Sequence, residues 1–359
     1  MRRVYLDNIR WITIVLVVIY HVIYMYNGIE TFGVIGPFSD QVQYQDMFQY
    51  VVYPWFMVLL FVVAGMCSRY YLESHSHKEF IRTRTAKLLV PSTVGLFVFQ
   101  WILGYYNMLI GGAFEQMAQV PKPVIYLIMC VSGTGVLWFV QVLWLVSLLL
   151  VVIRKIEKDR WYRICGKANV PLLLLLTLVI WGAAQILNTP MIVVYRFGIY
   201  GVSFLIGYFV LSHDQVIEKL SKAWMPLAAA AFVFMICFCY FYWQKPYAEH
   251  TVLDTPLCNV YAWIATLAII AFMSRFGNFD HAICRFMNKQ AWGLYIFHYL
   301  PLAACAWYLH IYAGNLPAWV VYLLTAFAGF AGAYVLNAIL SRVPVLRWCV
   351  LGITKGGKK

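Results

Sequence analysis

Residues 7–24 read DNIRWITIVLVVIYHVIY, an apolar run with a cation, Arg10, near its start and an imidazole, His21, near its end. Ten uncharged residues separate these two side chains. If the run crosses a bilayer, burying a cation and an imidazole is costly and indicates a function. A helix turns by about 100° and rises by about 1.5 Å per residue, so Arg10 and His21 share one face, roughly 16 Å apart. The stretch predicts a membrane helix whose polar stripe runs from one surface to near the midplane.

The composition is typical of a protein that crosses the membrane many times. The chain is 63% apolar and 11% charged, whereas a soluble protein carries about a quarter charged residues. The formal net charge of +13 does not indicate a nucleic-acid partner, because the basic residues lie in alternate short loops. None of the nine cysteines forms a CxxC pair, so we expect neither a disulfide framework nor a metal site.

We expect an all-α polytopic membrane protein with ten spans, at approximately 8–28, 48–72, 86–110, 132–153, 170–188, 195–212, 225–243, 256–275, 291–312 and 318–340. This assignment places 22 of the 27 Lys and Arg residues on one side of the membrane. The positive-inside rule then predicts that both termini are cytoplasmic. We expect residues 1–359 to form a single transmembrane domain, with a core of about 5–340 and a short basic tail at 341–359.

Two interpretations of the Arg10–His21 stripe follow from the residues alone. In the structural one, Arg10 extends to the membrane surface and His21 bonds a neighbouring helix. In the functional one, Arg10 binds an anionic group that enters from the cytosol, and His21 acts as a base within the membrane. The structural interpretation does not explain why the two side chains share a face, so we prefer the functional one.

Three further clusters are candidates for chemistry. Cations crowd the expected cytoplasmic end of the second span and the following loop, either as topology signals or as a site for a phosphorylated cofactor. Aromatic and amide side chains open the fourth span, where a membrane-interface anchor is the plainer reading. A tyrosine and a histidine spaced i, i+3 share a helix face in the ninth span. The residues of these clusters are, in order, Arg69, Arg82, Arg84 and Lys87; Trp138 and Gln141; and Tyr295 and His298.

Five segments, in this order, resemble the motifs of the acyltransferase-3 family of integral membrane proteins: Arg10 and His21 with ten residues between them, Ala64-Gly65 with Arg69, Arg82-Thr-Arg84 through Pro91, Leu137-Trp138-Phe139, and Gly293-Leu-Tyr295-Ile-Phe-His298. The resemblance covers essentially the whole chain. The start of the first span and the Ala-Gly pair are most similar to a branch of the family typified by a glucan succinyltransferase.

The resemblance implies O-acylation of an extracytoplasmic glycan or cell-envelope polysaccharide at the cytoplasmic (inner) membrane of a bacterium. The implied donor is cytoplasmic acyl-CoA, either acetyl-CoA or succinyl-CoA, with no metal. Arg10 and His21 are the implied catalytic residues, and His21 either deprotonates the acceptor hydroxyl or carries the acyl group. The implied support residues are Tyr295 and His298, with Trp138 and Gln141 on the acceptor side. The CoA phosphates would be held by Arg10, Arg69, Arg82, Arg84 and Lys87.

The main rival is a transporter or flippase for an envelope lipid or small anion, in which Arg10 and His21 line a conduction path. Such proteins usually contain inverted repeats with broken helices, and no repeat is visible in the sequence. A receptor or membrane scaffold would leave the shared polar face unexplained.

Overall fold

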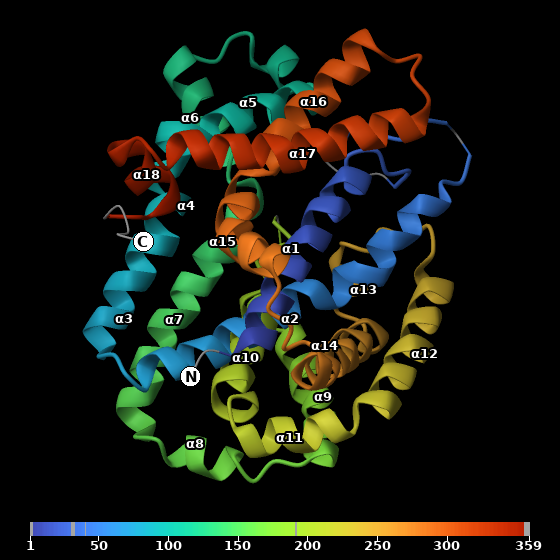
Figure 1. Ribbon diagram of the computed structural model, residues 1–359. Coiled ribbons are helices and arrows are strands. Elements are labelled where there is room, and N and C mark those ends of the chain that lie inside the picture. The colour runs from blue at the N-terminus through green and yellow to red at the C-terminus, as the bar shows by residue number, and fades with distance from the viewer. Residues whose placement is uncertain (1–2, 30–32, 40, 191, 355–359) are drawn as a thin grey trace. The chain divides into compact units, whose positions relative to one another are not determined.

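The computed structural model describes residues 3–29, 33–39, 41–190 and 192–354 (Figure 1). Within these ranges the secondary structure is helical, apart from one bridged pair, Asn188 and Arg196. The expectation of an all-α protein is therefore confirmed. Seven helices in the described ranges are long and apolar enough to cross a membrane, and a bent pair would make an eighth.

The count of ten spans stays a prediction. Two of the expected spans, 170–188 and 195–212, fall on apolar helices that are shorter than a usual span, Val170–Ala184 and Phe197–Leu211. The expected connection at 111–131 contains a further helix, α6 (Lys122–Ser132), which has Pro123 in its first turn. Proline favours a helix start because its fixed φ and missing N–H suit the first turn. The orientation of the termini also stays a prediction.

The chain divides into two compact units. The first unit comprises Met1–Thr13, Tyr50–Arg82 and Val142–Asn288, and the second comprises Ile14–Gln49, Thr83–Gln141 and Lys289–Lys359. Five helices contribute residues to both units: α1 (Val4–Tyr24), α2 (Met47–Leu72), α3 (His77–Arg84), α7 (Trp138–Glu157) and α15 (Ala282–Phe297).

The first unit is held together by close helix crossings. A Cβ added to Gly65 of α2 would lie 2.0 Å from the Phe204 carbonyl oxygen, and one added to Gly207 would lie 2.1 Å from that of Val62. Small residues at these positions let the two backbones touch, as is common between membrane helices. The remaining elements of this unit are α8 (Arg160–Cys165), α9 (Val170–Ala184), α10 (Phe197–Ile206), η6 (Gly207–Leu211), α11 (Asp214–Lys222), α12 (Trp224–Tyr242), α13 (His250–Leu253) and α14 (Pro256–Phe276).

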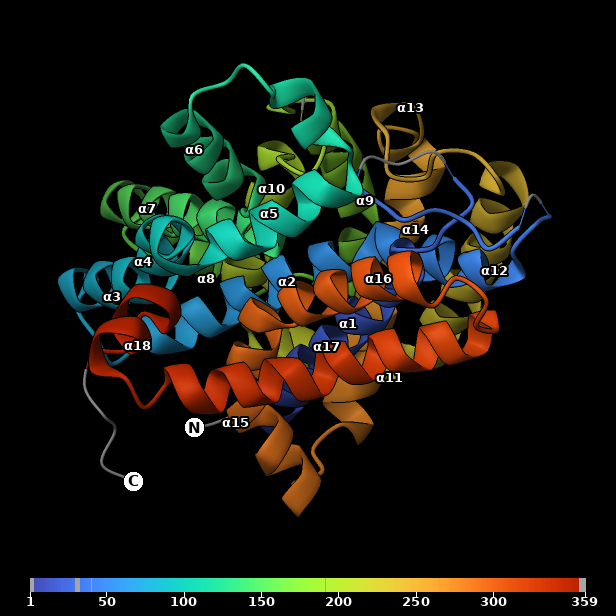
Figure 2. The same ribbon diagram turned by 90° about the horizontal axis from the view of Figure 1, so that it is seen from above.

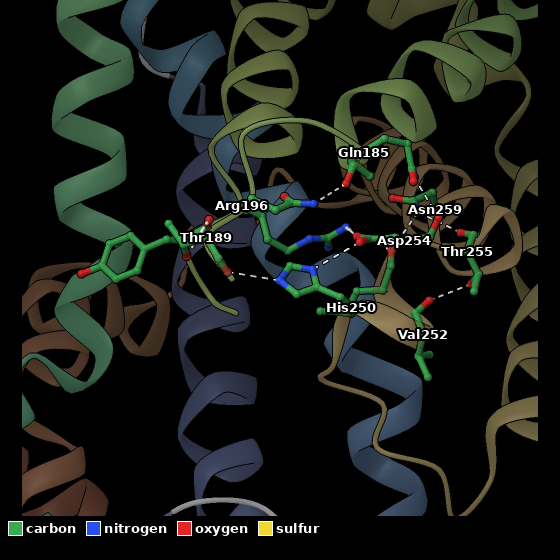
Figure 3. Close-up of polar contacts among 12 residues, drawn as sticks. Gln185, Thr189, Arg196, His250, Val252, Asp254, Thr255 and Asn259 are labelled. Carbon is green, nitrogen blue, oxygen red and sulfur yellow. Dashed lines mark hydrogen bonds and ion pairs between the residues drawn. The ribbon is translucent and has the colours of Figure 1, made fainter. Parts of the chain in front are cut away.

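A polar network joins the connection after α9 to the segment before α14 (Figure 3). The Arg196 guanidinium donates to the Leu253 carbonyl at 3.0 Å and to the Asp254 carboxylate at 3.1 Å. His250 lies 3.2 Å from the other oxygen of that carboxylate, and the Gln185 amide donates to the Asp254 carbonyl at 2.8 Å. These contacts fix the two loops to each other within the first unit.

The second unit packs its helices closely around glycines as well. A Cβ added to Gly104 would lie 1.8 Å from the Met129 carbonyl oxygen, and one added to Gly133 would lie 2.1 Å from that of Gln100. Helices α16 and α17 run alongside each other (Figure 1). The elements of this unit are η1 (Tyr44–Asp46), η2 (Thr85–Leu89), α4 (Val90–Ser92), η3 (Leu96–Gln100), α5 (Trp101–Ile110), η4 (Ala113–Met117), α6 (Lys122–Ser132), η5 (Gly135–Leu137), α16 (Tyr299–Tyr312), α17 (Ala318–Leu340) and α18 (Pro344–Leu351).

The segment 344–351, which lies in the expected basic tail, forms the packed helix α18. It lies next to α4 (Figure 2). Cys349, Val350 and Leu351 are buried, and Gly352 ends the helix in the left-handed conformation with φ 66°. A Cβ at Gly352 would lie 2.0 Å from the Ala86 carbonyl oxygen, so glycine suits this position for two reasons.

The third expected span is interrupted in the second unit. Two π-helical turns, η2 and η3, flank a break at Thr93, which has φ −129° and ψ −76°. Pro91 and Gly95 lie on either side of this break. π-helical turns leave backbone groups without their usual helical partners and are frequent at functional sites.

Candidate functional site

Helix α1 is continuous from Val4 to Tyr24, so Arg10 and His21 lie on one unbroken helix, as the sequence predicts. Arg10 pairs with Asp7 at 3.2 Å, and its side chain is 49% exposed. The Asn8 side-chain amide donates to the Gly277 and Phe279 carbonyls at 2.7 and 2.8 Å. The Asp-Asn-x-Arg start therefore anchors α1 within the first unit and keeps the guanidinium accessible to solvent.

A sharp bend separates α15 from α16 at His298. The two helices meet at 55°. The cause is Pro301, since a proline has no N–H to donate to the carbonyl four residues earlier, that of Phe297, and its ring displaces that carbonyl. The expected span 291–312 is thus present as two helices. The Leu294 carbonyl at the bend still accepts from the His298 backbone N–H at 3.1 Å, and the His298 ring contacts both this carbonyl and that of Tyr295.

His298 is fully buried, and its Nδ1 lies 2.9 Å from both the Leu294 and the Tyr295 carbonyl oxygens. A carbonyl oxygen only accepts hydrogen bonds, so Nδ1 of His298 carries a proton. In the neutral ring Nε2 is then an acceptor, and it lies 3.2 Å from Nδ1 of His21. Nδ1 of His21 also lies 2.8 Å from the Val17 carbonyl oxygen, so it carries a proton as well.

These contacts define the tautomer of His21. Its Nδ1–H is shared between the Val17 carbonyl and Nε2 of His298, so Nε2 of the neutral His21 ring is an unprotonated acceptor. Within the described part of the chain, no hydrogen bond is formed by this atom. His21 is partly exposed, while His298 is not. The pair therefore presents one basic nitrogen at its accessible end.

Aromatic rings surround this pair. The Tyr299 ring meets the His21 ring edge to face at 4.9 Å, and Tyr20 does so at 5.1 Å. A Cβ added to Gly135, which has φ 42°, would lie 3.6 Å from the Tyr299 ring. The turn before α7 therefore lies against the Tyr299 ring, which packs on His21. A glycine at position 135 adopts the positive φ of this turn and leaves room for the Tyr299 ring.

Tyr295 connects the bent pair to the start of α7. Its hydroxyl donates to the Val136 carbonyl, and its ring meets Phe139 edge to face at 5.7 Å. Trp138 is buried beside Phe139 at 6.3 Å between ring centroids. The structure thus brings Tyr295, His298 and His21 into one unit with the Leu-Trp-Phe segment. That Trp138 bounds the acceptor side stays a prediction.

Two glutamines support the interrupted third span. The Gln141 amide donates to the Ser92 carbonyl at 2.9 Å, beside the break at Thr93. The buried Gln100 amide donates to the Ile296 carbonyl at 3.4 Å, two residues before His298. In the structure, Gln141 therefore holds backbone groups in place, and a contact with substrate stays a prediction.

Arg69 has several partners within the first unit. Its guanidinium lies 2.7 Å from Asp159, 3.4 Å from Glu73 and 3.6 Å from the centre of the Tyr162 ring. Burial raises the pKa of the Asp159 carboxyl, but Arg69 and Arg154 lower it by more, and the net shift is downward. Binding of a phosphate by Arg69 would require exchange of these partners, so its role toward a cofactor stays a prediction.

The other predicted cations follow one another along α3 and η2. Arg82 and Lys87 are exposed, and Arg84 is partly buried at the end of α3. Lys87 lies within the π-helical turn, next to the residue whose carbonyl approaches Gly352. These side chains are accessible, as cofactor binding requires, and their role stays a prediction.

Sequence reasoning missed three residues of this site. Tyr299 follows His298 directly, and Pro301 sits three residues after it, which is a recognisable signal for a broken helix. Gly135 precedes the Leu-Trp-Phe segment and follows Gly133 by two residues, and such a pair of glycines before an apolar run is a weaker signal of a turn. Their contacts with the histidine pair depend on how distant segments pack, which no local pattern reports.

Seven long apolar helices in the described ranges, together with a histidine pair within the second unit, indicate a multi-pass membrane protein. The sequence profile described as an acyltransferase domain matches residues 3–338. The chain therefore belongs to the acyltransferase-3 family and is a membrane acyltransferase. Searches of curated proteins and of solved structures gave no match.

Proposed function

We propose that this protein transfers an acetyl or succinyl group from cytoplasmic acyl-CoA to a hydroxyl of an extracytoplasmic glycan at the inner membrane. The observation that carries the proposal is the His21–His298 pair, which presents an unprotonated Nε2 within a family of acyltransferases. The distribution of Lys and Arg supports an orientation with Arg10 at the cytoplasmic end of α1 and His21 deeper in the membrane.

His21 is the general base of the proposed reaction. Its Nε2 takes the proton of the acceptor hydroxyl while that oxygen attacks the thioester carbonyl carbon. The new C–O bond forms, the C–S bond breaks, and the proton held at Nε2 passes to the departing CoA thiolate. This route uses the observed tautomer and leaves the Nδ1 proton between Val17 and His298 in place. A route through an acyl-histidine would have to redistribute that proton.

The break at His298 supplies groups for the developing oxyanion. The amides at the start of α16, Tyr299 and Leu300, have no acceptor within their own helix because the first turn of a helix leaves its N–H groups unpaired. A helix N-terminus also carries partial positive charge. The bend places this N-terminus directly after His298. These amides are our candidates for oxyanion stabilisation.

The donor side is proposed to involve the accessible cations Arg10, Arg82, Arg84 and Lys87. Planar guanidinium groups suit the phosphates of CoA. Between Arg10 and His21, Ile14 and Val17 complete the shared face of α1, and both are buried. Because other residues cover Ile14 and Val17, the pantetheine arm cannot lie over this face. In the proposal it runs beside the face to reach His21.

A transporter or flippase is the second candidate. The observation that favours it is the pair of interrupted spans, at Thr93 and at His298, since transporters bind substrates at broken helices. The membership of the acyltransferase-3 family favours transfer.

Thermal stabilisation by CoA separates the two candidates. A ligand that binds only the folded state raises its stability, so CoA should raise the unfolding midpoint of the purified protein. Arg10→Ala should weaken this stabilisation and raise KM for acyl-CoA, while Arg285→Ala, an exposed control, should do neither. Transport in the absence of acyl-CoA, together with an unfolding midpoint that does not respond to CoA, would contradict the transferase proposal and support the transporter.

A further inference from the structure

A cluster of three aromatic rings lies just beyond the end of α1 in the second unit. Tyr26 and Phe38 stack at 5.0 Å, and Tyr322 of α17 meets them edge to face at 5.5 and 5.2 Å. Tyr26 is buried and bonds Thr325 at 2.8 Å, whereas Phe38 is 38% exposed. We call Tyr26, Phe38 and Tyr322 the aromatic cluster.

Amide and carboxylate side chains surround the aromatic cluster. The Asp46 carboxylate is buried and accepts from the Gly28 backbone at 2.9 Å and from Gln43 at 3.4 Å. The amide of Gln45 is exposed and donates to the Tyr322 hydroxyl at 3.4 Å. Asp46 therefore holds the loop in place, and Gln45 remains accessible beside the rings.

This combination suits a sugar ring better than lipid. An aromatic belt at the membrane surface needs rings whose polar ends reach water, and Phe38 has no polar end. A pyranose presents a flat face of C–H groups that packs on a ring, with hydroxyls at its rim. A planar amide at the edge of the ring both donates to and accepts from such hydroxyls.

The aromatic cluster lies close to the proposed base along the chain. Tyr26 follows His21 by five residues, about 7.5 Å at the rise of a helix. The Met25 amide still donates to the His21 carbonyl at 3.1 Å, so the turn that carries Tyr26 is continuous with α1. In the proposed orientation, this end of α1 is the extracytoplasmic one.

We propose that Phe38, Tyr322 and Gln45 form a subsite for a sugar ring of the acceptor glycan, which places a neighbouring hydroxyl of that glycan at His21. Phe38 supplies the stacking face, Gln45 pairs with a ring hydroxyl, and Tyr322 orients Gln45. The inference rests on the proposed function for its substrate class.

The test is equilibrium binding of a β-linked glucose oligosaccharide to the purified protein without acyl-CoA. The wild type should bind the oligosaccharide, and sorbitol, which has hydroxyls but no ring face, should not compete. Phe38→Ala and Gln45→Ala should each weaken binding roughly five- to tenfold, and Phe38→Trp should retain it. Phe327→Ala, an exposed phenylalanine of α17, is the matched control and should bind as the wild type does.

Absence of oligosaccharide binding in the wild type would overturn the subsite. So would equal affinity in Phe38→Ala, Gln45→Ala and the control. These results are independent of transfer: a protein that binds the oligosaccharide through Phe38 but never acylates it contradicts the proposed function alone. A protein that acylates a glycan with an unchanged KM in Phe38→Ala contradicts the subsite alone.

Discussion

Replacing His298 removes the acceptor that shares the Nδ1 proton of His21. In His298→Ala, the Val17 carbonyl still holds that proton at 2.8 Å, so the His21 ring keeps one of its two restraints. One hydrogen bond contributes about 0.5–1.5 kcal/mol, which corresponds to a fall in kcat of roughly 2- to 12-fold. Loss of a general base costs far more, about 10²- to 10⁴-fold. The account therefore predicts a modest effect at His298 and a severe one at His21.

The stability of the same variant should also fall. His298 Nδ1 donates to the Leu294 and Tyr295 carbonyls at the bend. In the variant the Leu294 carbonyl keeps the backbone N–H of residue 298, whereas the Tyr295 carbonyl loses this donor, and a buried acceptor left without a donor costs about 1–3 kcal/mol. His298→Gln should restore part of both losses, because its amide donates to a carbonyl and accepts from Nδ1 of His21. Activity must accordingly be compared at a temperature where all variants are folded.

The assay is the initial rate of acyl transfer in detergent or nanodiscs, with kcat and KM determined separately for each variant. His310→Ala is the matched control, because His310 is an exposed histidine on α16, away from the bend. An unchanged kcat in His298→Ala would refute a positioning role. A fall as large as that of a His21 variant would also refute it, since His298 would then act in the chemistry itself.

Three further predictions concern the scaffold. Gly65→Ala should destabilise the protein by about 1–3 kcal/mol or more, because its Cβ would lie 2.0 Å from the Phe204 carbonyl oxygen; an unchanged unfolding midpoint would contradict the close crossing. Asp159→Asn should lower stability by about 1 kcal/mol at pH 7, a value limited by solvent screening at this 42% exposed carboxylate. Because the pKa of Asp159 is lowered in the folded state, this stabilisation is fully present above the unfolded pKa of about 3.9 and is lost as pH falls through the folded pKa. The melting curves of the two proteins should therefore begin to converge below about pH 4 and should coincide only below the folded pKa of Asp159. Pro301→Ala supplies the N–H that the bend lacks, and should straighten the helix and lower kcat by about 10²-fold if the first-turn amides hold the oxyanion; a variant with full activity would remove those amides from the mechanism.

The sequence predicts where the helices of this protein lie better than where those helices break or bend. Apolar length and loop charge are local, so the helices and the Arg10–His21 face are visible without a structure. The sequence pattern predicts uninterrupted spans at 86–110 and 291–312, although Pro91, Gly95 and Pro301 lie where the structure interrupts them. The reason is that a proline within an apolar run permits a kink, while the neighbouring helices decide how large it becomes.

The residues of the candidate site could likewise be predicted from the sequence, but their contacts could not. His21 and His298 each stand out as ionisable residues in apolar runs, and the structure joins them at 3.2 Å across 277 positions of sequence. Which ring nitrogen is basic could not be predicted, because the tautomer follows from carbonyls at Val17, Leu294 and Tyr295. The pairing of Arg69 with Asp159 could not be predicted either, because the two residues are 90 positions apart in the sequence.

Single-turnover transfer by His21→Asn tests the central claim most directly. An asparagine keeps an amide donor for the Val17 carbonyl and for His298, and it removes only the basic Nε2. We predict that its transfer rate falls by about 10²- to 10⁴-fold, while the unfolding midpoint and its increase with CoA match those of the wild type. Transfer at the wild-type rate by this folded, CoA-binding variant would contradict the assignment of His21 as the base.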